Sequence, residues 1–312
     1  MTTTRLRSLC LALAASAALV VLGACSSPPS PAPAQSDAAH RAEIEAWRAE
    51  RDKELRDEDG WLTLAGLFWL EEGASTFGSA SDNTVVFPAG QAPARLGTFH
   101  REGEKVTLEV TPGLGLKADG KEVTVPRLEL APDASGKPTL LSIGSLTFHV
   151  IRRPGKIGIR LKDKESAVLA GFTGVDSFAI DPSWRIEARF EPYDPPKKIK
   201  VPNIIGTDFD ETSPGALVFE RDGATYRLEP TGEPGDELFL VFGDATNGHQ
   251  TYGGGRFLYV PAPKDGKAVV DFNKAYNPPC VFTPYATCPL PPRQNKLALR
   301  IEAGDKMWGE AH

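Results

Sequence analysis

The chain has 312 residues, of which 35 are basic and 41 acidic, and its formal net charge is −6 at pH 7. A nucleic-acid-binding surface needs an excess of basic residues to neutralise phosphates, so this balance argues against a nucleic-acid partner. Hydrophobic residues make up 41% of the chain, which is ordinary for a globular protein. The length allows one large core or two smaller ones.

Residues 1–24 have the layout of a secretory signal. Arg5 and Arg7 precede an apolar stretch that runs from Leu9 to Leu22, and two small residues follow it. A membrane-spanning helix needs about 20 continuous apolar residues, so we expect this shorter segment to be removed rather than to span a membrane. Its removal would leave 33 basic and 41 acidic residues and a net charge of −8.

The sequence Leu22-Gly23-Ala24-Cys25 resembles the bacterial lipobox. The resemblance implies that the Cys25 thiol receives a diacylglycerol and that this cysteine begins the mature protein; the alternative is an ordinary cleavage site with a chance cysteine. Ser26, in place of an aspartate, resembles the outer-membrane sorting pattern of Gram-negative lipoproteins. We therefore expect a lipoprotein of the cell envelope, whose lipid anchor binds the membrane on the periplasmic face of the outer membrane.

A tether and then a helix follow the lipobox. Residues 25–36 are rich in proline and serine and lack large apolar side chains, so we expect a semi-extended tether. Residues 37–60 are dense in charge, with Ile44, Trp47 and Leu55 as a sparse apolar stripe. Proline is absent and glycine occurs only at the last position, which predicts an amphipathic helix.

Short runs of β-branched and aromatic residues, separated by turn signals, make up the rest of the chain. Turn signals occur at REGEK near residue 103, ADGK near 119, RRPGK near 154, RDGA near 222 and KDGK near 265. Each supplies backbone angles that tight hairpins need, and no second convincing helix is present. We predict a mainly β body of antiparallel strands, a sandwich or barrel, divided into an N-terminal β domain (61–199) and a C-terminal β region (200–312). The proline-rich, acidic segment 195–214 is interpreted as a linker between them.

The strand pattern between residues 73 and 152 resembles that of a forkhead-associated (FHA-like) sandwich. The segments that carry the resemblance are FGSASDNTVVFP, ARLGTFHREGEKVTLEV, LKADGKEVTV and LLSIGSLTFHVI, in that order. Such domains read phosphothreonine with an arginine after the first glycine and a serine three residues before the histidine. Here Ser79 follows Gly78, and Gly97 stands three residues before His100, so the resemblance implies the fold without its phosphopeptide-reading residues.

Two cysteines remain for the body of the protein. Cys10 lies in the signal and Cys25 is expected to carry lipid, which leaves Cys280 and Cys288. In an oxidising envelope we interpret this pair as a disulfide that closes a nine-residue loop. The alternative is a metal or reactive-thiol site. No histidine lies near the pair in sequence, and we expect neither a metal nor a cofactor.

Polar residues gather in GDATNGHQTYGGGRFLYV and in VVDFNKAYNPPCVFTPYATCPLPPRQNKLALRIEAG. Together with GWLTLAGLFWLEEGASTFGS, these segments resemble a bacterial and archaeal domain-of-unknown-function family, number 1684. The motifs that carry the resemblance are Asp271-Phe272-Asn273, Tyr276-Asn277-Pro278, Cys280, Cys288-Pro289 and Asn295. The family name implies no activity.

The candidate ligand-binding or catalytic residues are Asp244, Tyr252, Arg256, Asp271, Asn273 and Asn277. If they converge, Asp271 could act as a general base and Arg256 could clamp an anionic group, with Asn273 or Asn277 as a polarising donor. Alternatively, the Asp and Asn side chains cap turns and Arg256 pairs with Asp271 structurally. Convergence in one concave pocket is the condition for an enzyme.

Two further clusters have competing interpretations. Asp208, Asp210 and Glu211 offer the oxygen ligands that calcium prefers, but their spacing lacks a twelve-residue loop, which favours a solvated acidic turn. The aromatic residues Trp61, Phe68 and Trp69 either line a ligand cleft or belong to a core. Our leading hypothesis is a non-catalytic envelope module that binds a small ligand or a protein. The alternatives are a hydrolase-like enzyme and a purely structural protein.

Overall fold

The charged segment after residue 36 forms helix α1 (Asp37–Leu55), which buries His40 and Ile44. The helix ends earlier than expected because Asp57 accepts a hydrogen bond from the backbone N–H of Asp59 and turns the chain. The structure is a computed structural model and describes residues 37–309; the expected signal, the lipid-bearing cysteine and the tether lie outside this range. Within it, no helix has the length and apolar character needed to cross a membrane.

Two sheets form the part of the chain that follows α1. One has the strand order β1-β11-β10-β9-β6-β7 and the other β3-β2-β4-β5-β8, and every pairing except that of β2 with β3 is antiparallel. The strands are β1 (Leu64–Trp69), β2 (Gly73–Gly78), β3 (Val85–Val86), β4 (Gly97–Glu102), β5 (Lys105–Val110), β6 (Lys117–Ala118), β7 (Lys121–Glu122), β8 (Arg127–Leu130), β9 (Leu141–Ile143), β10 (Leu146–Arg153) and β11 (Lys156–Asp163).

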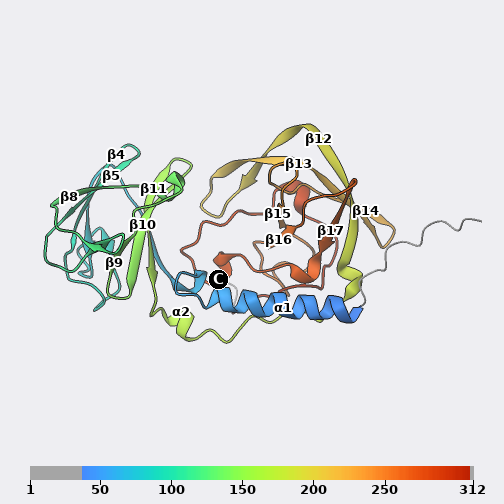
Figure 1. Cartoon of the computed structure of the whole chain (residues 1–312), viewed down its shortest axis with the longest axis horizontal. Coiled ribbons are helices and arrows are strands. Elements are labelled where there is room, and N and C mark those ends of the chain that lie inside the picture. The colour runs from blue at the N-terminus through green and yellow to red at the C-terminus, as the bar shows by residue number, and fades with distance from the viewer. Residues whose placement is uncertain (1–36, 310–312) are drawn as a thin grey trace, which may run out of the picture. The chain divides into compact units, whose positions relative to one another are not determined.

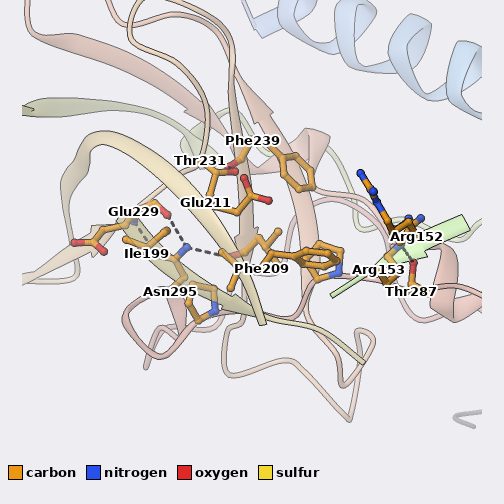
Figure 2. Close-up of a pocket in the computed structure, with 14 residues that line it drawn as sticks. Arg152, Arg153, Ile199, Phe209, Glu211, Glu229, Thr231, Phe239, Thr287 and Asn295 are labelled. Atoms are coloured by element: carbon orange, nitrogen blue, oxygen red, sulfur yellow. Dashed lines mark hydrogen bonds between the residues drawn. The ribbon is translucent and has the colours of Figure 1, made fainter. Parts of the chain in front are cut away.

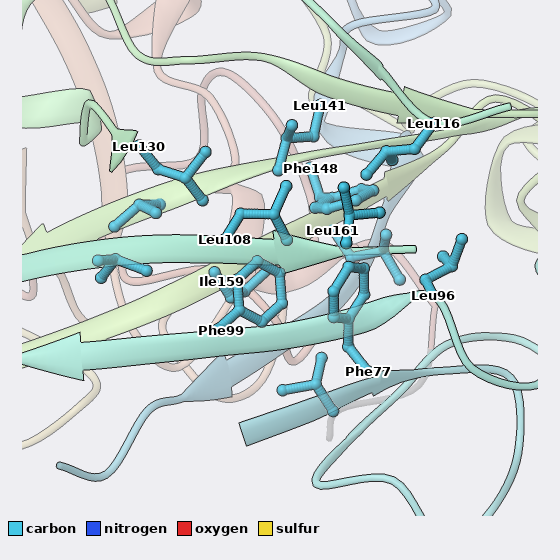
Figure 3. Packing of buried hydrophobic residues seen from close by; sticks show 14 of the residues in the cluster. Phe77, Leu96, Phe99, Leu108, Leu116, Leu130, Leu141, Phe148, Ile159 and Leu161 are labelled. Atoms are coloured by element: carbon cyan, nitrogen blue, oxygen red, sulfur yellow. The ribbon is translucent and has the colours of Figure 1, made fainter. Parts of the chain in front are cut away.

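Side chains from both sheets meet in one hydrophobic cluster (Figure 3). Phe77 and Phe99 stack with their ring centroids 4.3 Å apart, and Phe148 of the other sheet approaches Phe77 edge-on at 5.9 Å. Because strand side chains alternate between faces, Ile159 and Leu161 of β11 reach this cluster while Arg160 between them faces away from it. The predicted sandwich is therefore present in this half of the chain.

The C-terminal half contains a four-stranded antiparallel sheet, β14-β13-β12-β17, and a separate antiparallel pair, β15-β16. Its strands are β12 (Arg185–Pro202), β13 (Asp208–Arg221), β14 (Ala224–Leu228), β15 (Leu238–Phe242), β16 (Arg256–Val260) and β17 (Lys267–Asp271). A one-turn helix, α2 (Ala167–Ala170), and six short 3-10 turns complete the described elements. Figure 1 shows α1, in blue, running below this half in the view; it contacts the 3-10 turn Phe272–Lys274, which follows β17. The mainly β fold with one main helix confirms the prediction.

Four of the five predicted turns connect neighbouring antiparallel strands, namely β4–β5, β6–β7, β10–β11 and β13–β14. Asp119 and Asp222 adopt left-handed φ angles of 49° and 51°, and a glycine follows each. This is the backbone conformation that Asp-Gly hairpin turns require. The fifth turn, at Asp265, connects β16 and β17, which belong to different sheets.

The segment 195–214 is not a linker, because it contains most of the β12–β13 hairpin. Pro195, Pro196 and Pro214 lie in the register shift between the pairs Pro192–Gly215 and Lys197–Ser213, where the two strands are not paired, and β12 pairs with β17 only as far as Arg189. Residue 200, at which we divided the body, thus lies inside a strand. The boundary between the two largest hydrophobic clusters lies earlier in the chain, because the first cluster ends at Leu161 and the second begins at Trp184.

Candidate ligand-binding site

Arg256 is fully buried. Its Nη2 lies 2.8 Å from Oδ2 of Asp244, and neither side chain has any exposed surface. The guanidinium also donates to the backbone carbonyls of Ile301, Ala303 and Asp305. Burial lowers the pKa of Arg256, and the negative charge of Asp244 opposes that shift. The pairing with Asp271 is not formed, and Arg256 presents no open face to an anionic substrate.

Asp271 caps a turn and contacts the N-terminal helix. One carboxylate oxygen accepts the backbone N–H and the side-chain amide of Asn273, and the other lies 2.6 Å from Nε2 of His40. Asn273 also exchanges hydrogen bonds with the backbone of Asp181. Such contacts are the ones expected from the structural alternative, in which Asp and Asn side chains cap turns.

The six candidate residues do not share a cavity. Asn277 is held by Asp305 and by the carbonyl of Lys306, and Tyr252 packs among hydrophobic side chains, where burial raises its pKa. Asp271 and Asp244 line two different cavities, and the other four residues line none of the five cavities described. The condition set for the enzyme interpretation is therefore not met.

The loop between Cys280 and Cys288 borders two cavities. The two sulfur atoms are 2.23 Å apart, at disulfide distance, and the backbone N–H of Cys280 also approaches the sulfur of Cys288 at 3.2 Å. Two cavities lie against this loop, and both are lined by Thr287 and Pro289. We refer to them as the apolar cavity and the cationic cavity.

The apolar cavity has a volume of about 360 Å³. It is lined by Arg152, Arg153, Ile199, Val201, Phe209, Glu211, Glu229, Thr231, Phe239, Val241, Thr287, Pro289, Pro292 and Asn295. Figure 2 shows Phe209 in the middle of the group, with the two arginines on one side and Glu229 on the other. Seven of the fourteen lining residues are apolar, and apolar side chains combined with polar groups at fixed positions are found in small-molecule sites.

Hydrogen bonds fix the acidic side of the apolar cavity. Glu229 accepts hydrogen bonds from Tyr193, Lys197 and Gln294. Burial acts to raise the pKa of Glu229, but these donors outweigh burial and hold the pKa below its usual value. Asn295 joins the Glu229 backbone to the carbonyl of Val241, which gives this residue of the sequence motif a definite position in the wall.

The cationic cavity has a volume of about 370 Å³ and lies on the face of β10 and β11 that points away from the sandwich core. It is lined by Asp59, Trp61, Leu64, His149, Arg160, Lys162, Phe257, Pro279, Ala286, Thr287, Cys288 and Pro289. Arg160, Lys162 and His149 were not among the predicted site residues, although the alternation in KIGIRLKD predicts that the first two share a face. Trp61 was expected in a cleft or a core, and it lines this cavity; Phe68 packs on the core.

The largest described cavity, about 690 Å³, lies between α1 and the β16–β17 region and carries charges of both signs. Lys274 pairs with Glu43 and Lys267 with Glu187, so much of this charge is neutralised internally. Among residues 37–309, no group of three or more His, Cys, Asp or Glu side chains is arranged to hold a metal ion.

Comparisons with known proteins match parts of the chain. The family described as "Protein of unknown function (DUF1684)" matches residues 170–306. An uncharacterized protein of Haloarcula marismortui, solved by NMR, is 30% identical over 44% of this chain and 78% of that chain, with a TM-score of 0.37. A structure from a study of phosphothreonine-dependent FHA domain interactions is 15% identical over 31% of this chain and 92% of that chain, with a TM-score of 0.22. No curated protein matches.

Proposed function

The chain belongs to the DUF1684 family of proteins of unknown function, and we propose that it is a binding module that takes a small, mainly apolar molecule into the apolar cavity. The observation that carries the proposal is the composition of that wall, in which Ile199, Phe209 and Phe239 surround space for a ligand. Apolar surface left open to water is unfavourable by about 25 cal/mol per Å², so covering it favours an apolar occupant.

Rigid surroundings favour binding without a large ordering cost. Asn295 and Glu229 are held in place by several hydrogen bonds, and the disulfide loop forms a neighbouring wall. A preformed site loses little conformational entropy when it is occupied. The polar groups at the two ends of the cavity would orient a ligand that carries a polar group.

A lipid anchor is the second part of the proposal. Cys25 lies outside the described residues, so its support is the lipobox-like sequence alone. Diacylglycerol on this cysteine would hold the binding module at an envelope membrane, with the periplasmic face of the outer membrane as the expected place. Expression of the full chain with a labelled fatty acid tests this: label should enter the wild type and be absent from Cys25→Ser.

Saturation with the uncharged, apolar fluorescent dye N-phenyl-1-naphthylamine tests the binding function. We expect saturable binding by the folded protein and about tenfold weaker binding by Val201→Phe, because the added ring occupies the cavity. Val86→Phe, which makes the same change at an exposed position on β3, should leave the affinity unchanged.

Near-UV circular dichroism must show that both variants keep native packing, because this dye also binds loosely packed states. Equal dye affinity in Val201→Phe and Val86→Phe, or no saturable binding by the wild type, would contradict the assignment of the apolar cavity. A hydrolase that uses Asp271 and Arg256 gains no support from the geometry, since Arg256 is sealed and the two residues do not share a cavity.

A further inference from the structure

The cationic cavity places two cations side by side on one strand. Arg160 and Lys162 of β11 are two residues apart, so their side chains leave the same face of the sheet. His149 of β10 lies directly opposite Arg160 in the antiparallel register, which brings its imidazole to that face as well. All three side chains line the same cavity.

Neither cation is neutralised within the described part of the chain. Arg160 forms no salt bridge there; its Nη2 donates to Oγ1 of Thr287 at 3.1 Å, and its buried Nε has no partner. Lys162 also forms no salt bridge, and its ammonium donates to the backbone carbonyl of Asp59 at 2.6 Å. The nearby carboxylate of Asp133 pairs with Arg153 at 2.7 Å. A guanidinium that is removed from water without a counter-charge is normally unfavourable.

The remaining wall supplies little negative charge. Asp59 is the only carboxylate that lines the cavity, and it belongs to an exposed turn. Burial lowers the pKa of Arg160 to about 10, and the charge of Arg153 adds to that effect. Burial and Arg160 together lower the pKa of His149 to about 4, so the imidazole is neutral near pH 7 and can donate one hydrogen bond.

We propose that the cationic cavity is a binding site for a small oxyanion group, phosphate or carboxylate, held by Arg160 and Lys162. A guanidinium matches the oxygens of such a group with two parallel donors, and charge-assisted hydrogen bonds of this kind are about twice as strong as neutral ones. The cavity of about 370 Å³ has room for the group together with a small attached body against Trp61 and Phe257. The site shares Thr287 and Pro289 with the apolar cavity, but Arg160, Lys162 and His149 line the cationic cavity alone.

Titration calorimetry of the wild type with sodium phosphate, and separately with sodium acetate, tests the proposal and distinguishes the two oxyanions. Sodium chloride at equal ionic strength is the control for screening. We expect saturable binding of at least one oxyanion beyond the chloride control, and roughly tenfold or greater loss of affinity in Arg160→Gln. Lys164→Gln is the matched control, since it removes one positive charge close to Lys162 but outside the cavity, where Lys164 pairs with exposed Glu58.

Thermal unfolding in chloride buffer separates a binding role from a structural one. If Arg160 binds an anion and has no counter-charge in the empty cavity, Arg160→Gln should unfold at the same or a higher temperature than the wild type. The reason is that the substitution removes an unpaired buried charge. A merely structural arginine would instead lower the melting temperature when replaced. Phosphate or acetate should raise the melting temperature of the wild type and of Lys164→Gln by mass action.

Lys162→Gln is a second cavity variant, which tests the proposal if Arg160→Gln fails to fold. It should weaken oxyanion binding severalfold relative to Lys164→Gln. The proposal is overturned if neither oxyanion binds the wild type beyond chloride. It is also overturned if the cavity variants bind as tightly as Lys164→Gln.

Discussion

His40 in the first turns of α1 and Asp271 at the end of β17 share a buried hydrogen bond of 2.6 Å, although 231 residues separate them in the chain. The same carboxylate also caps the 3-10 turn Phe272–Lys274 by accepting hydrogen bonds from Asn273. One side chain therefore fixes both the position of the helix and the exit of the strand. The conspicuous Asp-Phe-Asn motif thus has a structural use in the fold.

Replacement of Asp271 with alanine should lower the free energy of unfolding by about 2 to 4 kcal/mol, because His40 and Asn273 lose their buried partner. Denaturant unfolding measures this. Asp236→Ala, at an exposed position, should change stability by no more than about 0.5 kcal/mol. In a double-mutant cycle, His40→Ala combined with Asp271→Ala should cost less than the sum of the single changes; strict additivity would mean that the pair is not coupled.

The buried pair of Arg256 and Asp244 gives a second prediction. Asp244→Ala leaves a fully buried guanidinium without its counter-charge, so we expect a loss of about 3 to 5 kcal/mol. Glu302→Ala, which breaks the exposed pair with Arg300, should cost about 0 to 1 kcal/mol. Comparable losses of unfolding free energy for the two variants in urea would show that the Arg256 guanidinium is in contact with water.

His149 should make stability depend on pH in the acid range. Its pKa is lowered to about 4 in the folded chain and is about 6.5 when unfolded, so the unfolded chain binds more protons between these values. The free energy of unfolding must then fall as the pH drops from about 6.5 to about 4. Partial exposure limits the loss to on the order of 1 kcal/mol.

His149→Gln should flatten the dependence of the melting temperature on pH in this window. His249→Gln, at an exposed position, should retain the slope of the wild type. Identical slopes in the wild type and His149→Gln would mean that this imidazole is not held in its neutral form.

Cys280 and Cys288, whose sulfur atoms lie at disulfide distance, should contribute to stability and to ligand binding. Cys280→Ser with Cys288→Ser opens a loop with a sequence separation of 8 residues and should cost roughly 2 to 4 kcal/mol. Both proposed sites should weaken as well, because the loop forms a wall of each cavity. Chemical unfolding and calorimetry measure the two effects; a double variant with unchanged affinities would place the binding determinants elsewhere.

Features that depend on neighbours in the chain were predictable. Asp119 and Asp222 mark hairpin turns because an Asp-Gly pair adopts the required backbone angles wherever it occurs. The helix and the mainly β class followed in the same way from local composition and periodicity. The cysteine pair was predictable by counting, on the expectation that Cys10 belongs to a signal and Cys25 to a lipobox.

Features that depend on distant segments were not predictable from the sequence. Arg256 follows a glycine run that suggests an open loop, yet the carbonyls that surround it come from residues 301–305. Arg160 and Lys162 were predictable as neighbours on one strand face, but nothing local indicates that Thr287 lies across from them. The conspicuous polar residues Asp244, Asp271 and Asn295 could therefore be singled out from the sequence and line three different cavities, whereas the cations of the cationic cavity could not be.

Thr287 has a particular place between the two cavities. Its oxygen accepts hydrogen bonds from Arg153 at 3.0 Å and from Arg160 at 3.1 Å, which occupies both lone pairs. The hydroxyl proton must therefore point away from both guanidinium groups. This polarity makes the threonine a hydrogen-bond donor to any occupant within reach, and a valine at this position would keep the shape of the wall while removing the proton it offers.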